Sequence, residues 1–247
     1  NYAGGVQMII NAKNLGYQEL NEQIRQTSEH DITITDCIGQ RYIGAGLSGK
    51  NITIHGTPGN ALAAYMNGSS IHVYGNAQDA TADTMNDGVI CIHGCAGDAT
   101  GYAMRGGHIL VRDDTGYRAG IHMKEYEDKV PVLMIGKKAG SFLGEYQAGG
   151  VIVVFNIGGG EEAPVGYFCG TGMHGGKIFL RCSVPPHDLP KQVCWRDAEP
   201  DDLESIREYV QEFADAFGYN TDELLSQHYI VLTPNSASPY KQLYTLN

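Results

Sequence analysis

The chain has 247 residues, 33 glycines, six cysteines and a formal net charge of −11, a length sufficient for one large domain with a substantial core. The negative charge disfavours nucleic acid and anionic membranes as partners. No apolar run approaches the roughly 20 residues of a membrane span, no signal-peptide pattern opens the chain and no C-x-x-C motif occurs, so we expect a cytoplasmic protein with reduced cysteines.

Two short elements are predicted before residue 30. Residues 6–10 alternate like a lead-in strand, and residues 16–29 have the period of an amphipathic helix. Leu20 and Ile24 lie on its apolar face, with charged side chains opposite. Such a helix is expected to cover the open strand edge at which a repeat structure begins.

From residue 32 to residue 181 the sequence repeats a unit of about nineteen residues. Two apolar anchors open each unit: Ile32/Ile34, Ile52/Ile54, Ile71/Val73, Ile90/Ile92, Ile109/Val111, Val132/Met134, Ile152/Val154 and Ile178/Leu180. A later slot holds Met66, Met85, Met104, Met123 and Met173, with Leu47 and Gln147 as variants. The fixed period and the two-residue alternation predict an all-β fold. We expect a right-handed parallel β-helix, a single-stranded solenoid of about seven coils, with the methionine column pointing inward.

Residues 44–51 nearly match a phosphate-binding loop. The pattern G-x-x-x-x-G-K-[ST] fails only at Asn51, and G-x-G-x-x-G is also present. A phosphate loop must precede a helix, whereas the anchors Ile52 and Ile54 indicate a following strand. We therefore predict no nucleotide site and no cofactor-binding residues on this chain.

Histidines and cysteines invite a metal interpretation. His55 and His93 share one repeat slot but lie two units apart, which separates them by roughly 9.6 Å, too far to share one ion. Cys91 and Cys95 lack a second ligand pair at a usual spacing. A ladder of solvated side chains and packed thiols is the better interpretation, so no metal site and no catalytic residue is predicted.

The outward-facing positions become apolar in the later units. Because side chains of a strand alternate, the residues that follow each anchor are expected to point outward. In the later units these outward residues are apolar and would form a large exposed patch: Leu110, Leu133, Ile135, Val153 and Phe155. This candidate docking face must be covered by the C-terminal helix of the chain, by a partner subunit or by a second copy. Two charged or glycine-rich insertions, at residues 124–131 and 156–165, are expected to form surface loops.

The repeat stops near residue 182, which divides the chain into residues 1–182 and a C-terminal extension of residues 183–247. Four prolines predict an extended strap up to residue 200. A helix is expected over residues 201–217 with Gly218 as its stop, and Asn220 or Thr221 begins a short second helix. The tail, residues 229–247, is apolar and aromatic enough to dock rather than float.

The repeat resembles the GXGXG β-helix domain of glutamate synthase, and it is closest to the version in which that domain is a separate polypeptide. The pattern G-D-x-x-G-x-x-M-x-G-G at residues 97–107 carries the resemblance, together with residues 39–46, 116–124, 144–150 and 170–176. Gln147 departs from it where Met is expected. The same repeat resembles the C subunit of formylmethanofuran dehydrogenase, but the helical C-terminus from Asp201 favours glutamate synthase.

The resemblance implies a non-catalytic subunit of a glutamate synthase-like oxidoreductase, coupled to an amidotransferase and dependent on flavin. Its partners would be a glutaminase subunit and a synthase subunit, and the latter would hold FMN and an iron–sulfur centre. Related assemblies acting on N-methylglutamate, or the formylmethanofuran system, would look alike at this level. An enzyme with a carboxylate or histidine site on its outer face remains the alternative class.

Overall fold

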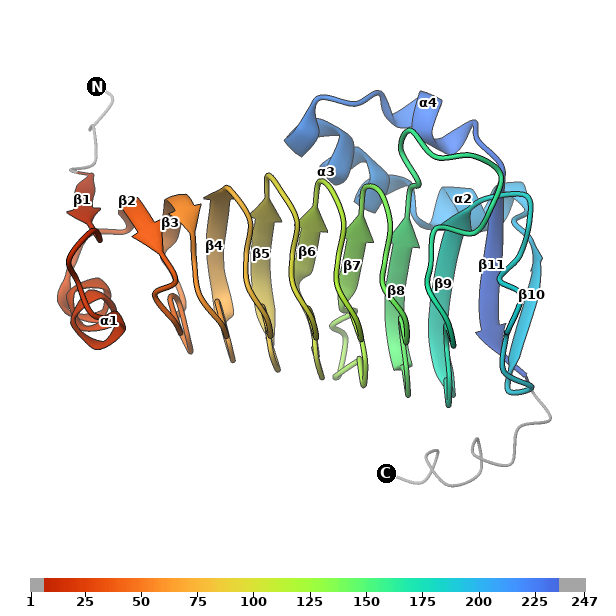
Figure 1. Cartoon of the computed structure of the whole chain (residues 1–247), viewed down its shortest axis with the longest axis horizontal. Helices are drawn as coiled ribbons and strands as arrows, with labels where there is room; N and C mark the ends of the chain where they lie inside the picture. The colour runs from red at the N-terminus through yellow and green to blue at the C-terminus, as the bar shows by residue number, and fades with distance from the viewer. Residues whose placement is uncertain (1–6, 236–247) are drawn as a thin grey trace.

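The computed structural model describes residues 7–235, whose strands form one mixed sheet (Figure 1). The sheet order is β1-β2-β3-β4-β5-β6-β7-β8-β9-β11-β10, with parallel pairing from β1 to β9 and antiparallel pairing of β11 with β9 and β10. The strands are β1 (Met8–Asn11), β2 (Asp31–Ile38), β3 (Asn51–Thr57), β4 (Asn67–Tyr74), β5 (Asp87–Ile92), β6 (His108–Val111), β7 (Val132–Ile135), β8 (Ala148–Val154), β9 (Gly175–Arg181), β10 (Val193–Asp197) and β11 (Tyr229–Pro234).

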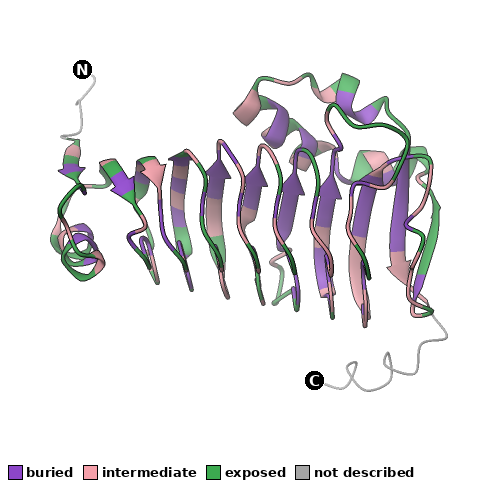
Figure 2. Cartoon of the chain, viewed as in Figure 1, coloured by how far each residue is buried: buried purple, intermediate pink, exposed green. Residues whose placement is uncertain are grey.

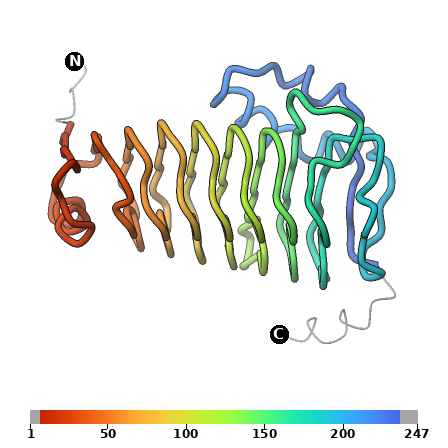
Figure 3. Tube along the Cα trace, in the orientation of Figure 1, coloured from red at the N-terminus to blue at the C-terminus, as the bar shows by residue number. Residues whose placement is uncertain are grey.

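The predicted fold class, an all-β right-handed parallel β-helix of about seven coils, is wrong. The described residues form a single, mostly parallel mixed sheet with a few short helices, which is an α/β-like sheet and not a closed all-β solenoid. Each repeat contributes one strand and returns through turns (Figure 3). Residues such as Ala80, Ala82 and Ala99 take positive φ values of 55° to 61° in these turns, and this left-handed backbone interrupts a strand.

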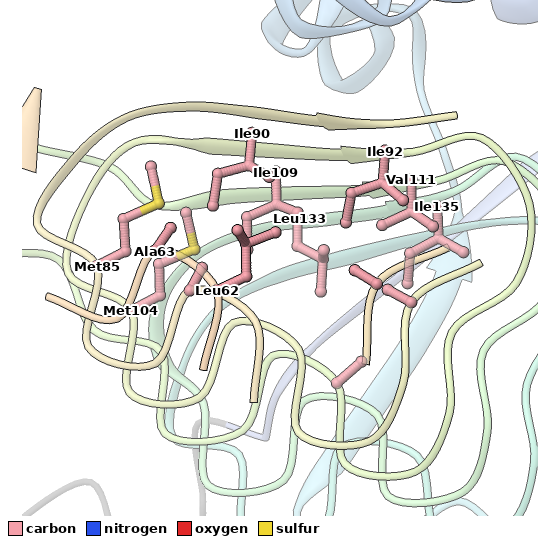
Figure 4. Packing of buried hydrophobic residues seen from close by; sticks show 14 of the residues in the cluster. Leu62, Ala63, Met85, Ile90, Ile92, Met104, Ile109, Val111, Leu133 and Ile135 are labelled. Carbon is pink, nitrogen blue, oxygen red and sulfur yellow. The ribbon is translucent and has the colours of Figure 1, made fainter. Parts of the chain in front are cut away.

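The space between the strands and the return turns is filled by a hydrophobic core, which we call the inner core. The predicted inward direction of the methionine column is confirmed there. Met66, Met85, Met104, Met123 and Met173 are all fully buried beside the strand anchors. Figure 4 shows Met85 and Met104 reaching towards Ile90 and Ile109 from the return turns. Backbone hydrogen bonds between successive returns, such as Gly101 N to the Thr81 carbonyl at 2.8 Å, hold each turn in register with the next.

Aspartates join successive repeats at one corner. The Asp79 carboxylate accepts a hydrogen bond from Asp98 N, and Asp98 in turn accepts one from Tyr117 N, each at 2.8 Å. A side chain at Gly97 or Gly116 would overlap the Oδ1 atom of the aspartate in the preceding repeat. The aspartate of one repeat therefore requires a glycine in the next repeat, because its carboxylate occupies the space that a Cβ would fill.

The predicted anchors of β7, Val132 and Met134, are wrong by one residue. Ile109 pairs with Leu133 and Val111 pairs with Ile135, so these two residues of β7 face the inner core. Figure 4 shows Leu133 and Ile135 in the same rows as Ile109 and Val111. All four residues of β7 are buried and apolar, so no alternation of polar and apolar residues indicates which of them face the inner core.

Four short helices complete the described fold. The predicted helix of residues 16–29 is α1 (Tyr17–Gln26), which buries Leu20 and Ile24 in the inner core. The helix predicted over residues 201–217 is two helices, α2 (Pro200–Ser205) and α3 (Arg207–Phe217), because the backbone at Ile206 leaves the helical region. Gly218 ends α3 in a left-handed conformation, as expected. Asn220 caps α4 (Thr221–Leu225) by accepting the N–H of Glu223 at 2.9 Å.

The C-terminal extension takes part in the sheet. The strap contributes β10 near its end, and the tail docks between β9 and β10 as β11, which confirms docking for residues 229–234. Residues 236–247 of the predicted tail lie outside the described residues. The division of the chain at residue 182 stays a prediction. Within residues 7–235, no helix has the length and apolar character needed to cross a bilayer.

Candidate functional site

The outer face of the sheet has two different halves. Helices α2 to α4 lie over its later part, where α3 reaches back as far as β5, while β3 and β4 have no helix over them (Figures 1 and 2). Beneath the helices lies a second buried core, distinct from the inner one, to which Leu110, Val153 and Phe179 contribute from the sheet. Phe213 of α3 packs on Phe155 with ring centroids 4.3 Å apart.

The structure does not bring the five predicted docking residues onto one exposed face. Leu110, Val153 and Phe155 belong to the outer core under α3, whereas Leu133 and Ile135 belong to the inner core. All five are at most 1% exposed. For Leu110, Val153 and Phe155 the cover is thus provided within the chain, by its own C-terminal helices. Docking of a partner over this part of the molecule stays a prediction, and it would have to take place on the helices.

Two polar contacts fix the covering helices to the sheet. His108 Nδ1 of β6 lies 2.6 Å from Glu212 Oε2 of α3. Arg196 of β10 donates to both carboxylate oxygens of Asp202 in α2, one of them at 2.9 Å. Hydrogen bonding by Arg196 lowers the pKa of Asp202 to about 2, although burial opposes the shift. The Asp202 carboxylate also accepts the N–H of Glu199 at the start of α2. One buried charge therefore binds the β10 arginine and caps the helix.

The half without a helical cover carries a stack of rings. Tyr74 lies between His55 and His93, with centroid distances of 5.3 and 4.5 Å and nearly parallel planes. Phe217, the last residue of α3, meets His93 edge-on at 5.1 Å. This arrangement agrees with the predicted side-chain ladder for His55 and His93, because Tyr74 occupies the space between them.

Sequence reasoning missed a tighter cluster beside that stack. The donor atoms of His72, Cys91 and His93 all lie within 4.8 Å of one another, and Cys91 Sγ is 3.5 Å from His93 Nε2. The signal was present in the alternation, since Cys91 and His93 are two residues apart and His72 is the parallel partner of Cys91. The sequence comparison considered only residues at the same position of the repeat. His72 and Cys91 share one position and His93 belongs to another, so the cluster was missed.

The Cys91–His93 pair is neutral. Burial raises the pKa of Cys91 to about 12, and the Glu212 carboxylate adds to this shift. Burial also lowers the pKa of His93, assisted by His72 and Arg112. A protonated thiol beside a neutral imidazole is not the thiolate–imidazolium pair of a cysteine nucleophile. The near-match to a phosphate loop likewise has no helix behind it, because β3 begins at Asn51.

A column of exposed aromatic side chains follows the return turns. At three repeats the residue that precedes the methionine slot is an exposed ring: Tyr65, His122 and Tyr146 stand beside the buried Met66, Met123 and Gln147. His122 stacks on Tyr146 at 5.2 Å and meets Tyr102 edge-on at 5.8 Å. Tyr102, two residues before Met104, is also exposed, and we call Tyr65, Tyr102, His122 and Tyr146 the aromatic column. Tyr65 is 60% exposed and Tyr146 43% exposed, which leaves large ring faces open to solvent.

Comparison with known proteins places the repeat in a family. The profile of the GXGXG motif family matches residues 16–235. An uncharacterized protein of Methanocaldococcus jannaschii is 43% identical over 255 aligned positions, which cover 98% of this chain and 98% of that protein. The match spans both the repeats and the C-terminal helices.

Proposed function

Because the chain belongs to the GXGXG motif family, whose domain is found in glutamate synthase-type proteins, we propose that it is a non-catalytic structural subunit of a glutamate synthase-like oxidoreductase. In this role it would buttress a glutaminase subunit against a flavin-dependent synthase subunit. FMN and the iron–sulfur centre would belong to the synthase subunit. The observation that carries the proposal is the family match over residues 16–235.

The filled interior supports a scaffold role. The anchors and the methionine column pack into a continuous inner core along the sheet, and a second core joins the sheet to α3. Each repeat is bonded to the next through strand pairs and through the return turns. A body built in this way resists bending, because any change of angle between repeats would break several hydrogen bonds at once. Such rigidity suits a subunit that holds two others at a defined separation.

The aromatic column supports a docking role. Tyrosine rings bury a large area for a small loss of side-chain entropy, which makes them frequent at the centres of protein interfaces. Tyr102, His122 and Tyr146 already contact one another, so little further ordering would accompany binding. We propose that the aromatic column contacts one of the two partner subunits.

Reconstitution tests the proposal. The chain is produced together with a glutaminase chain and a flavin-binding synthase chain from the same genome, and assembly is followed by the mass of the purified complex. We expect a three-chain complex that, when supplied with a two-electron donor, forms glutamate from glutamine and 2-oxoglutarate, and weaker coupling between the two reactions when this chain is omitted. An equally active two-chain complex that excludes this chain would contradict the scaffold role.

Point variants separate docking from folding. The double variant Tyr65→Ala/Tyr146→Ala should leave the free chain folded but reduce its incorporation into the complex at least tenfold, because both rings are exposed in the free chain. Trp195→Ala is the matched control, since Trp195 is 48% exposed on β10 and lies outside the aromatic column. Equal incorporation of both variants would remove the aromatic column from the interface but leave the scaffold role standing.

A further inference from the structure

The pairing of β4 and β5 places three potential metal ligands on one face of the sheet. His72 is opposite Cys91 in the parallel register, and His93 follows Cys91 by two residues. Successive side chains of a strand alternate between faces, so Cys91 and His93 project from the same side. His72 reaches the same side from the neighbouring strand, about 4.8 Å away. Two imidazoles and one thiol therefore converge from a segment of only 22 positions.

The distances fit a single ion. A tetrahedral zinc ion lies about 2.1 Å from an imidazole nitrogen and about 2.3 Å from a thiolate sulfur, which places those two atoms about 3.6 Å apart. Cys91 Sγ and His93 Nε2 are 3.5 Å apart. The His72 donor lies within 4.8 Å of both, so rotation of its side chain closes the set without a backbone change.

We propose that His72, Cys91 and His93 bind one transition-metal ion of the zinc class. Two imidazole nitrogens and one sulfur are borderline to soft ligands, which suit zinc and disfavour calcium and magnesium. Three protein ligands leave a fourth position, which water fills in sites of this kind. On binding, Cys91 loses its thiol proton to solvent and becomes a thiolate, whose negative charge the positive charge of the ion compensates.

The surroundings of His93 hold one ligand in position. Its ring lies between the face of Tyr74, at 4.5 Å, and the edge of Phe217, at 5.1 Å. Ligands whose rings are oriented by neighbouring groups bind metal more tightly, because less rotation is lost on binding. Phe217 ends α3, so the site touches the border between the covered and the open half of the sheet. A bound ion would thus couple β4 and β5 to the end of the covering helices.

Cobalt provides the probe. The purified full chain is stripped of metal and titrated with Co²⁺, and absorption is recorded in the near-ultraviolet and the visible. We expect one equivalent of Co²⁺ to produce a thiolate-to-cobalt charge-transfer band together with the strong visible bands of tetrahedral cobalt, and one equivalent of Zn²⁺ to remove both. Metal content after dialysis, measured by mass spectrometry, should approach one zinc ion per chain.

Matched variants assign the ligands. Cys91→Ser should abolish the charge-transfer band, and His72→Gln or His93→Gln should weaken Co²⁺ binding at least tenfold. Cys95→Ser and His55→Gln are the controls, because Cys95 is another thiol four residues away and His55 is the other histidine of the same stack. Both controls should bind Co²⁺ as the parent chain does.

Folding is separated from binding by circular dichroism and thermal melting of each metal-free variant. His72→Gln changes only a partly exposed side chain and should melt like the parent chain. The proposal is overturned if the folded parent chain binds no Co²⁺, if the bound ion gives no thiolate band, or if His72→Gln binds as tightly as the parent. Loss of binding in Cys95→Ser to the same extent as in Cys91→Ser would also contradict it.

Discussion

The ring of Phe155, the residue that directly follows β8, lies 4.3 Å from the ring of Phe213 on α3, and both side chains are fully buried. This contact joins the outer face of the sheet to the helix that covers it. Phe213 also contacts Phe217 at 4.8 Å and Tyr219 at 5.9 Å, so it is the centre of an aromatic group. Stability of the C-terminal helices should therefore depend strongly on this one side chain.

Phe213→Ala should lower the free energy of unfolding by about 3–5 kcal/mol, because it leaves a cavity in the outer core. Urea unfolding followed by circular dichroism measures the change. Phe168→Ala is the control, since that ring is 49% exposed and should alter stability by less than about 1 kcal/mol. Equal losses in the two variants would show that α3 is not held by the Phe155–Phe213 contact.

Gly116→Ala should lower the free energy of unfolding by about 1–3 kcal/mol. A methyl group there would overlap Asp98 Oδ1 and come within 3.0 Å of Asp98 N, and neither belongs to a long side chain that could move aside. Gly160→Ala is the matched control, because a Cβ at Gly160 meets nothing within 4 Å. Thermal melting of the two variants side by side decides the question, and a Gly116→Ala protein as stable as the control would refute the steric account.

Gln147→Met and Met104→Gln, two exchanges in the methionine slot, should change the free energy of unfolding in opposite directions. Gln147 is fully buried, donates from Nε2 to the carbonyls of Gly149 and Gly150 at 3.2 and 3.1 Å, and its Oε1 has no partner among the described residues. Gln147→Met removes that unsatisfied acceptor and should raise stability by about 1 kcal/mol. Met104→Gln buries an amide in an apolar slot and should lower stability by about 2–3 kcal/mol. Urea midpoints that shift in the same direction for both variants would contradict this reading.

Asp202 should make the chain sensitive to acid. Its carboxylate is 8% exposed, and the Arg196 hydrogen bonds lower its pKa from 3.8 to about 2. Since the folded pKa lies below the unfolded one, the stabilisation is complete above about pH 4 and is lost as pH falls towards 2. Asp202→Asn should therefore be about 2 kcal/mol less stable than the parent at pH 6, and this difference should shrink by pH 2.5.

Asp222→Asn provides the comparison for this pH effect. Asp222 also pairs with an arginine, Arg207, at 2.9 Å, but its side chain is 83% exposed. An exposed pair contributes little to stability, so urea unfolding of this variant should follow that of the parent chain at both pH values. A difference between Asp202→Asn and the parent that stays constant from pH 6 to pH 2.5 would show that the Arg196 contact does not act through the charge of Asp202.

Several features could be predicted because they depend on local sequence. The anchors from Ile52 to Val111 recur every nineteen residues, and the methionine slot follows at a constant offset, so burial of one side chain in each repeat implied burial of its equivalents. Gly218 and Asn220 marked helix boundaries correctly, because a left-handed stop and a side-chain cap each need one residue type at one position. The GXGXG pattern also sufficed to identify the family.

Other features were decided only by the tertiary structure. The return of each repeat through turns, and hence the single mixed sheet, depends on left-handed residues such as Ala82 and Thr84 that no alternation pattern reveals. The register of β7 depends on α3, because a strand buried on both faces has no polar side to orient it. The His72–Cys91–His93 cluster depends on the pairing of two strands, since a metal site is defined by distances between side chains and not by their spacing along one strand. Sequence by itself determined which residues are buried in each repeat, and packing between elements determined what they face.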